Sequence, residues 1–219
     1  MLIGGLVKLL PAPGIEKDRD TEGCYDQLIH GVFESEGGDA TVVAIASASK
    51  GAGTNYIATD IAGELSRFSG KKTAIVDARQ LETISISDLE KWAKLCVASE
   101  TGVSWLKEEG KPAGNHKFNL KKRVSTWQSD RAFRRDCLQI LRKYFDYVLI
   151  ECHPVNRSTP LILLAELVDG VIVVAAAGET RRDEIQRLER QVEMAHGKVI
   201  GFILNKREYP IPQWLYEKI

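Results

Sequence analysis

The chain has 219 residues, 44% of them hydrophobic, which is enough for one domain with a substantial core. Lysine plus arginine and aspartate plus glutamate both number 30, so no excess of charge indicates nucleic acid, an anionic membrane or an acidic substrate as a partner. The cysteines also lack the CxxC or CxxH spacing of a metal site, which predicts free thiols. They are Cys24, Cys96, Cys137 and Cys152.

The chain begins with an apolar stretch, "MLIGGLVKLLPAPG", which is interrupted by Lys8 and stops at Pro11. This stretch is too short to span a bilayer and lacks the features of a signal peptide. We expect residues 1–36 to form a tail and a short helix in "CYDQLIHGVF", with the tail packing on its own domain or on a neighbour. Docking to a membrane surface or a partner is the alternative.

Apolar runs after residue 40 predict strands that are buried on both faces of a sheet. They lie at 41–47, 72–77, 147–151, 170–176 and 198–205. Helical patterns fall between them, at 55–68, 87–98, 102–109, 131–144 and 181–196. This alternation predicts an α/β fold with a mainly parallel sheet and helices on both faces. We place this domain at residues 37–207, before a tail rich in aromatic residues and proline at 208–219.

A phosphate-binding loop is predicted where the first of these strands, "TVVAIAS", runs through "ASKGAG" into the helix "TNYIATDIAGELSRF". Gly51 and Gly53 would let successive N–H groups face inward, and the following helix N-terminus adds partial positive charge. The candidate nucleotide-binding residues of this loop are Lys50, Gly51, Ala52, Gly53, Thr54 and Asn55.

The two residues that such a loop needs most are missing from it. A working P-loop continues with Lys, which bridges phosphate oxygens, and then Ser or Thr, whose hydroxyl holds Mg²⁺. Thr54 and Asn55 stand at these two positions. We therefore expect ATP or ADP to bind weakly if at all, and no Mg²⁺ or other metal to be held.

Several further segments share the pattern of one protein family. They are "GKKTAIVDARQ", "TGVSWLKEEGK", "KYFDYVLIECHPVN", "LAELVDGVIVVAAAGETRRDEI" and "GKVIGFILN". Over about residues 20–207 the chain resembles the cytoplasmic domain of the bacterial tyrosine kinases of capsule and exopolysaccharide biosynthesis (BY-kinases), which are relatives of the MinD/ParA group of P-loop ATPases. The resemblance implies a P-loop NTPase-like fold. In the family it also implies ATP-dependent phosphorylation of tyrosine, activated by the cytoplasmic tail of a companion membrane protein.

The resemblance fails at the residues that handle Mg·ATP. The family's second acidic motif ends in Asp-x-Asp, but here Asp77 is followed by Arg79, and the Walker B aspartate is Glu151. These three residues form a vestigial catalytic set, in which we expect Arg79 to pair with Asp77 or Glu151. The alternative is that Arg79 or Lys50 supplies the missing positive charge to a phosphate bound without metal.

Two other family features are also altered. Gly23, Asp26 and Ile29 stand where the family carries the Glu-x-x-Arg-x-x-Arg motif used for ring assembly. The C-terminal tyrosine cluster is absent, and only Tyr209 and Tyr216 remain there.

The remaining motifs allow simpler interpretations. Asn205, in "ILNKRE", could hold an adenine edge as the corresponding residue does in similar ATPases, or could only end a strand. Cys152 and His153 are adjacent and would point in different directions, which disfavours a nucleophile–base pair. The basic groups "KFNLKKR" and "RAFRRD" favour a solvated face over a DNA-binding one.

We therefore expect a degenerate BY-kinase-like protein that serves as a non-catalytic binding or regulatory component of exopolysaccharide or capsule biosynthesis. The alternatives are an active tyrosine kinase with relocated catalytic charges and a ParA/MinD-like nucleotide switch. The expected partner is a membrane polysaccharide co-polymerase, an activator protein or a sister kinase, with no nucleic acid involved. The expected location is the cytoplasm, at the inner face of the membrane through that partner.

Overall fold

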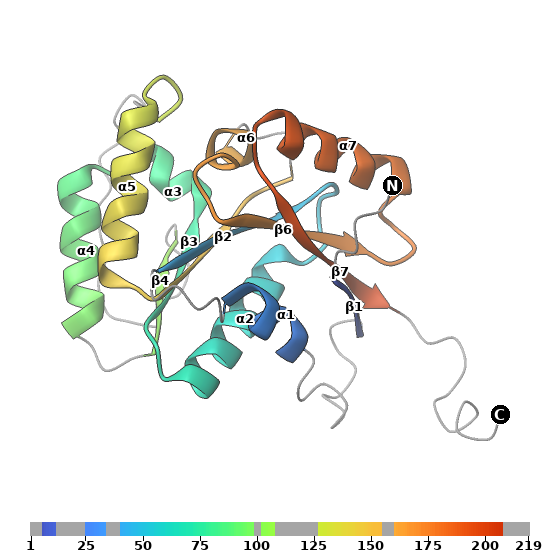
Figure 1. Ribbon diagram of the computed structural model, residues 1–219, viewed down its shortest axis with the longest axis horizontal. Coiled ribbons are helices and arrows are strands. Elements are labelled where there is room, and N and C mark those ends of the chain that lie inside the picture. Colours follow the sequence, from blue (N-terminus) through green and yellow to red (C-terminus); the bar gives the residue numbers. More distant parts are fainter. Residues whose placement is uncertain are drawn as a thin grey trace.

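The computed structural model describes residues 6–11, 25–33, 40–98, 102–107, 127–154 and 160–207. Its centre is a seven-stranded sheet in the order β1-β7-β6-β2-β5-β3-β4, in which every neighbouring pair is parallel (Figure 1). The strands are β1 (Leu6–Pro11), β2 (Thr41–Ser47), β3 (Thr73–Asp77), β4 (Val103–Leu106), β5 (Tyr147–Glu151), β6 (Gly170–Ala176) and β7 (Val199–Arg207).

Helices cover both faces of this sheet (Figure 1). One face packs against α1 and α2, and the other against α3 to α7. The helices are α1 (Asp26–Phe33), α2 (Thr54–Ser69), α3 (Ala78–Thr83), α4 (Ile86–Ala98), α5 (Arg131–Tyr144), α6 (Pro160–Leu164) and α7 (Arg182–Met194). The predicted α/β fold with a parallel sheet is confirmed.

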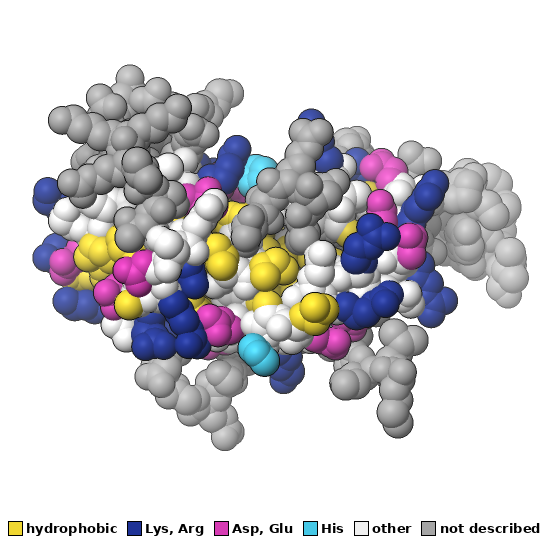
Figure 2. All heavy atoms as spheres, turned by 90° about the horizontal axis from the view of Figure 1, so that it is seen from above, with side chains coloured by type: hydrophobic (Ala, Val, Ile, Leu, Met, Phe, Trp, Pro, Cys, Tyr) yellow, Lys and Arg dark blue, Asp and Glu magenta, His cyan; other side chains and the backbone are white. Residues whose placement is uncertain are grey.

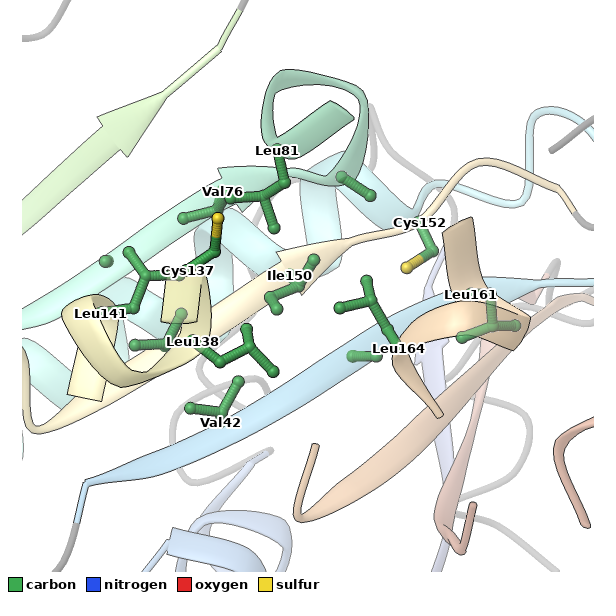
Figure 3. Close-up of a cluster of buried hydrophobic side chains, with 14 of the residues drawn as sticks. Val42, Val76, Leu81, Cys137, Leu138, Leu141, Ile150, Cys152, Leu161 and Leu164 are labelled. Atoms are coloured by element: carbon green, nitrogen blue, oxygen red, sulfur yellow. The ribbon is translucent and has the colours of Figure 1, made fainter. Parts of the chain in front are cut away.

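Strand β2 lies in the middle of the sheet and is buried along its whole length. Its side chains alternate between two hydrophobic clusters, with Val42 in one and Val43 in the other. Figure 3 shows the first cluster, where Leu138 of α5 and Leu161 of α6 meet the sheet. Because both faces are covered, the strand sequences read as continuous apolar runs, which explains why these strands were predictable.

The five predicted strands, the short helix in "CYDQLIHGVF" and four of the five helices predicted after residue 40 are confirmed, with boundaries that differ by about one or two residues. The helix predicted at 102–109 is wrong, because residues 103–106 form the edge strand β4. Its burial alternates, with Ser104 and Leu106 buried and Val103 and Trp105 half-buried, as a strand lying against the sheet requires.

The N-terminal stretch also contributes to the sheet. Residues 6–11, which we expected to belong to a tail, form β1 and pair with β7. Among the described residues, no helix is long and apolar enough to cross a membrane. Cys96, Cys137 and Cys152 are free thiols as predicted, and Cys24 lies outside the described residues.

Candidate functional site: the P-loop and the strand ends beside it

The loop between β2 and α2 has a tight backbone that depends on two glycines. Gly51 and Gly53 adopt φ values of 84° and 91°, in the left-handed region that side chains disfavour. Gly53 is the N-cap of α2, and no side chain caps the first N–H groups of that helix. Uncapped N–H groups at a helix start are what an anion would bind, so the loop retains the shape of a phosphate site.

Asn205 of β7 supports this loop from the core. Its Nδ2 donates a hydrogen bond of 2.9 Å to the carbonyl oxygen of Ala52, and the residue is only 1% exposed. A Cβ added to Gly53 would lie 2.3 Å from the same nitrogen, so the glycine is also needed for this close approach. Asn205 thus has a clear structural role, and its contact with adenine stays a prediction.

The predicted contact residues of the loop differ in their surroundings. Lys50 and Asn55 are exposed, and neither side chain makes a hydrogen bond or ion pair with the part of the chain that the structure describes. Lys206, which follows Asn205, pairs with Glu179 at 3.1 Å. Its Nζ lies 4.0 Å from the position of an added Cβ on Gly51, so a lysine that sequence reasoning did not select borders the loop.

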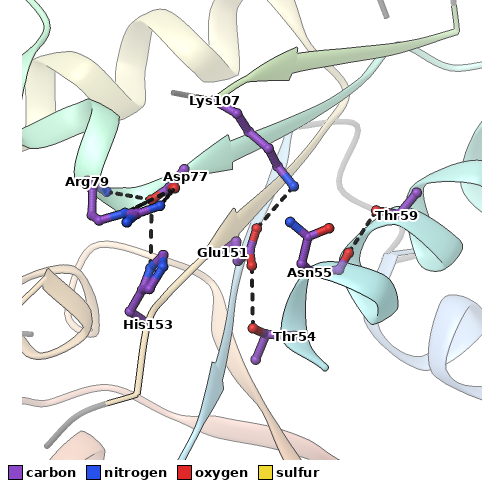
Figure 4. Close-up of polar contacts among 8 residues, drawn as sticks. All are labelled: Thr54, Asn55, Thr59, Asp77, Arg79, Lys107, Glu151 and His153. Atoms are coloured by element: carbon purple, nitrogen blue, oxygen red, sulfur yellow. Dashed lines mark hydrogen bonds and ion pairs between the residues drawn. The ribbon is translucent and has the colours of Figure 1, made fainter. Parts of the chain in front are cut away.

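Asp77, the first acid at the strand ends, is bound by Arg79 (Figure 4). The carboxylate caps α3 by accepting the backbone N–H of Arg79 at 2.9 Å. The guanidinium then reaches the same carboxylate, with Nη2 at 2.6 Å from Oδ2 and Nε at 3.2 Å from both oxygens. The predicted pairing of Arg79 with Asp77 is confirmed.

Glu151, the second acid at the strand ends, is bound by a cation that the sequence did not point to. Lys107, directly after β4, places its Nζ 3.2 Å from Oε2 of Glu151 and 4.4 Å from the ring centre of Trp105. Thr54 Oγ1 donates to Oε1 of the same carboxylate at 3.4 Å. Lys107 and Thr54, which stands in place of the P-loop lysine, therefore contact the same carboxylate (Figure 4).

The sheet register brings the two acids together. Asp77 and Glu151 are paired residues of the parallel strands β3 and β5, and both are nearly buried, at 3% and 6% exposed. His153 lies next to them, with Nδ1 3.8 Å from Oδ1 of Asp77. At this edge of the sheet, Asp77 thus pairs with Arg79 and Glu151 pairs with Lys107.

Cys152 follows Glu151 but faces away from this cluster. It is fully buried in the hydrophobic cluster of Figure 3, and burial, together with the charges of Asp77 and Glu151, raises the pKa of its thiol. The expectation that Cys152 and His153 do not form a nucleophile–base pair agrees with this placement.

The altered assembly motif is described only in part. Ile29, at the position of a family arginine, is 5% exposed and packs in the core beneath α1. The side chain of Asp26 and the residues Gly23, Tyr209 and Tyr216 lie outside the described part of the chain.

Curated relatives place these features in a known context. The tyrosine-protein kinase CpsD of Streptococcus agalactiae serotype III is 24% identical over 196 residues, which cover 83% of this chain and 81% of the relative. The CpsD of Streptococcus pneumoniae serotype 4 is 29% identical over 79 residues, or 36% of this chain and 35% of the relative. The succinoglycan biosynthesis transport protein ExoP of Rhizobium meliloti is 25% identical over 209 residues, and these are only 25% of its length. No protein-family model matches the chain.

Solved structures share the fold. The chimerical protein CapA2B2 superposes with a TM-score of 0.64 at 18% identity, covering 93% of this chain and 95% of that one. The kinase domain of the Escherichia coli tyrosine kinase ETK gives 0.58 at 16% identity, covering 88% and 78%. A plasmid partition protein from Borrelia burgdorferi gives 0.51 at 15% identity, covering 82% and 80%. The chain therefore has a P-loop NTPase-like α/β fold.

Within that fold class, the relatives named tyrosine-protein kinase relate the chain to BY-kinase domains. The resemblance stated from the sequence motifs is confirmed at this level.

Proposed function

We propose that this chain is a BY-kinase-like domain that does not transfer phosphate and acts as a binding or regulatory component of capsule or exopolysaccharide biosynthesis. One observation carries the proposal: the acids at the ends of β3 and β5, Asp77 and Glu151, are held by Arg79 and Lys107. In a kinase of this fold, acids at this edge would face Mg²⁺. Here the residues present do not fit the metal.

The magnitudes favour loss of Mg·ATP binding. Two unit charges about 4 Å apart at an effective dielectric near 20 interact with roughly 4 kcal/mol, so replacing an acidic metal anchor by Arg79 reverses a term of that size. The missing P-loop lysine removes a charge-assisted hydrogen bond worth about 1.5–3 kcal/mol, or one to two decades in affinity. Both changes oppose the same ligand.

The partner in this proposal is a membrane polysaccharide co-polymerase, an activator protein or a sister kinase. Support comes from relatives that include a succinoglycan biosynthesis transport protein and from the CapA2B2 chimera, whose fold the chain shares. Such a partner would bring the domain to the inner face of the membrane.

A second candidate function follows from the position of Lys107. Its ammonium and the hydroxyl of Thr54 bind the two oxygens of the same Glu151 carboxylate, and the ammonium could take over the role of the P-loop lysine if Glu151 released it. In that case the domain would bind nucleotide, and a kinase with relocated charges becomes the better description.

Calorimetric titration with ATP and ADP, with and without Mg²⁺, separates these functions. We expect no Mg²⁺-dependent binding by the wild type or by Thr54→Lys/Asn55→Ser, because Arg79 still opposes the metal. Adding Arg79→Asp to that double variant should produce Mg²⁺-dependent ATP binding. Gln186→Lys on α7 is the control for charge, because it adds one positive charge as Thr54→Lys does, but outside the loop. Micromolar, Mg²⁺-dependent binding by the wild type would refute the proposal.

A further inference from the structure

A groove of about 430 Å³ lies between α5 and the turn that follows α6. Its lining combines arginines with leucines, and four of the residues recur along one face of α5. The lining includes Arg131, Arg135, Leu138, Arg142, Glu166 and Leu167. Figure 2 views the molecule from above Figure 1, the side on which α5, α6 and α7 lie, and shows Lys and Arg side chains at several places around hydrophobic ones.

The two outer arginines of the groove already bind carboxylates of the chain. Arg131 places Nε 2.8 Å from Oε1 of Glu166, and Arg142 places Nη2 2.8 Å from Oδ1 of Asp169. Arg142 is further held by the carbonyl oxygen of Ala40. These contacts hold the arginines at both ends of the basic face and show that its guanidinium groups donate hydrogen bonds to carboxylates in this geometry.

Arg135 lies between these two arginines and lacks such a partner. It is exposed, and among the described residues no hydrogen bond or ion pair involves its side chain. It lies about one helical turn from Arg131 and about two turns from Arg142 on the same face. Among the described residues, this face therefore has three arginines and two carboxylates, Glu166 and Asp169, which leaves Arg135 without an anionic partner.

The apolar floor of the groove indicates which kind of anionic partner could supply a carboxylate to Arg135. Leu138 is buried at 3% exposed, and Leu167 packs half-buried against the same hydrophobic cluster, so Leu167 offers the apolar surface below the charged rim. A peptide suits this combination, because it can place an acidic side chain on the rim and an apolar one on Leu167.

We propose that this groove binds an acidic segment of a partner protein, with one carboxylate on Arg135 and an apolar side chain against Leu167. The inference deepens the proposed regulatory function by naming the surface and the chemistry of the partner. It does not involve the P-loop, so a negative result at the groove leaves the nucleotide titrations unaffected, and the reverse also holds.

The test uses a fluorescein-labelled peptide in which glutamate and leucine alternate, titrated with the full chain at about 50 mM salt and followed by fluorescence anisotropy. We expect saturable binding with a Kd of about 100 µM or tighter, weakened at least tenfold by Arg135→Glu. Arg187→Glu, an exposed and equally unpartnered arginine on α7 among the described residues, is the matched control and should leave the Kd within about twofold. Both variants should melt within about 2 °C of the wild type.

Three outcomes would overturn the proposal. They are no binding by the wild type, equal weakening by the two variants, and equal binding of a peptide in which glutamine replaces glutamate. Vesicles containing phosphatidylserine form the second arm. If they bind in an Arg135-dependent way while the peptide does not, the groove recognises lipid headgroups and the proposed protein partner is refuted.

Discussion

Arg79 holds the carboxylate of Asp77 from two directions, through its own backbone N–H at 2.9 Å and through its guanidinium at 2.6 Å. Asp77 and Arg79 are two positions apart at the junction of β3 and α3, so their contact lies at the first turn of that helix. The same carboxylate oxygens would otherwise be free to face a metal. A substitution at position 79 keeps the backbone N–H that Asp77 caps, and it removes the guanidinium and so changes the charge of the strand edge.

Arg79→Asp should convert this edge into one that responds to Mg²⁺. The buried Asp77 loses its cation and gains an anionic neighbour, so we expect a loss of about 1–3 kcal/mol in the free energy of unfolding without metal. Millimolar Mg²⁺ should then raise the melting temperature of the variant and not that of the wild type. Arg187→Asp on α7 is the control, and a Mg²⁺ response of the wild type or of this control would contradict the prediction.

Lys107→Ala should be destabilising although the lysine lies at a sheet edge. It leaves the Glu151 side chain, which is 8% exposed, without its cation, so the expected cost is about 1–3 kcal/mol. A double-mutant cycle with Glu151→Gln should give a coupling energy of about 1 kcal/mol or more.

The control is Lys91→Ala. Lys91 forms an exposed ion pair with Asp88 at 3.7 Å, so this variant should lose less than about 0.5 kcal/mol in the free energy of unfolding. Chemical denaturation of each variant gives the values. If both lysines cost the same, the ion pair of Lys107 does not stabilise the site.

Alanine at Gly53 and at Gly63 should have opposite effects on stability. Gly53→Ala forces a Cβ onto Asn205 Nδ2 at φ 91°, so the hydrogen bond to Ala52 must break, at a cost of about 2–4 kcal/mol. Gly63 lies inside α2 with nothing within 4 Å of an added Cβ, so Gly63→Ala should stabilise by about 0.5–1 kcal/mol. Thermal melts measure both, and an equally tolerated Gly53→Ala would show that Asn205 does not constrain the loop.

Glu82 should make stability fall with rising pH. Burial first, and then the charge of Asp77, raise the pKa of its carboxyl above 4.5, while Arg79 opposes the shift. Below pH 4.5 the group is protonated in both states and contributes nothing. As pH rises through the folded pKa, the folded state must carry an unfavourable charge.

Glu82→Gln should therefore be more stable than the wild type at pH 7, with a smaller difference at pH 4. Denaturant titrations at both pH values measure this difference. If Glu82→Gln is no more stable than the wild type at pH 7 than it is at pH 4, the charge of Glu82 does not destabilise the folded state.

Local features of the site could be predicted from the sequence, and distant ones could not. The pairing of Arg79 with Asp77 was predictable because the residues are two positions apart at a strand end. The contact of Lys107 was not predictable, because its position depends on residues 103–106 pairing with β3, and the sequence pattern of that short edge strand predicts a helix. A stretch that contacts only one neighbouring strand leaves a weak pattern in the sequence.

The same reasoning applies to the other end of the sheet. The buried strands read as continuous apolar runs, whereas β1 carries Lys8 and ends at Pro11, and it pairs with β7 from the far end of the chain. Edge strands tolerate such residues because one side makes no ladder hydrogen bonds. The sequence therefore predicted the middle of the sheet well and its two borders poorly.

Strand β1 also covers the edge of β7, the strand with which it pairs. A version of the protein shortened to begin after Pro11 would leave the outer N–H and C=O groups of β7 unpaired over five register positions, from Gly201 to Arg207. Such a row of groups is a template for strand addition from a second molecule. Removing residues 1–11 would then be expected to lower solubility before it disrupts the fold, with self-association detectable by light scattering.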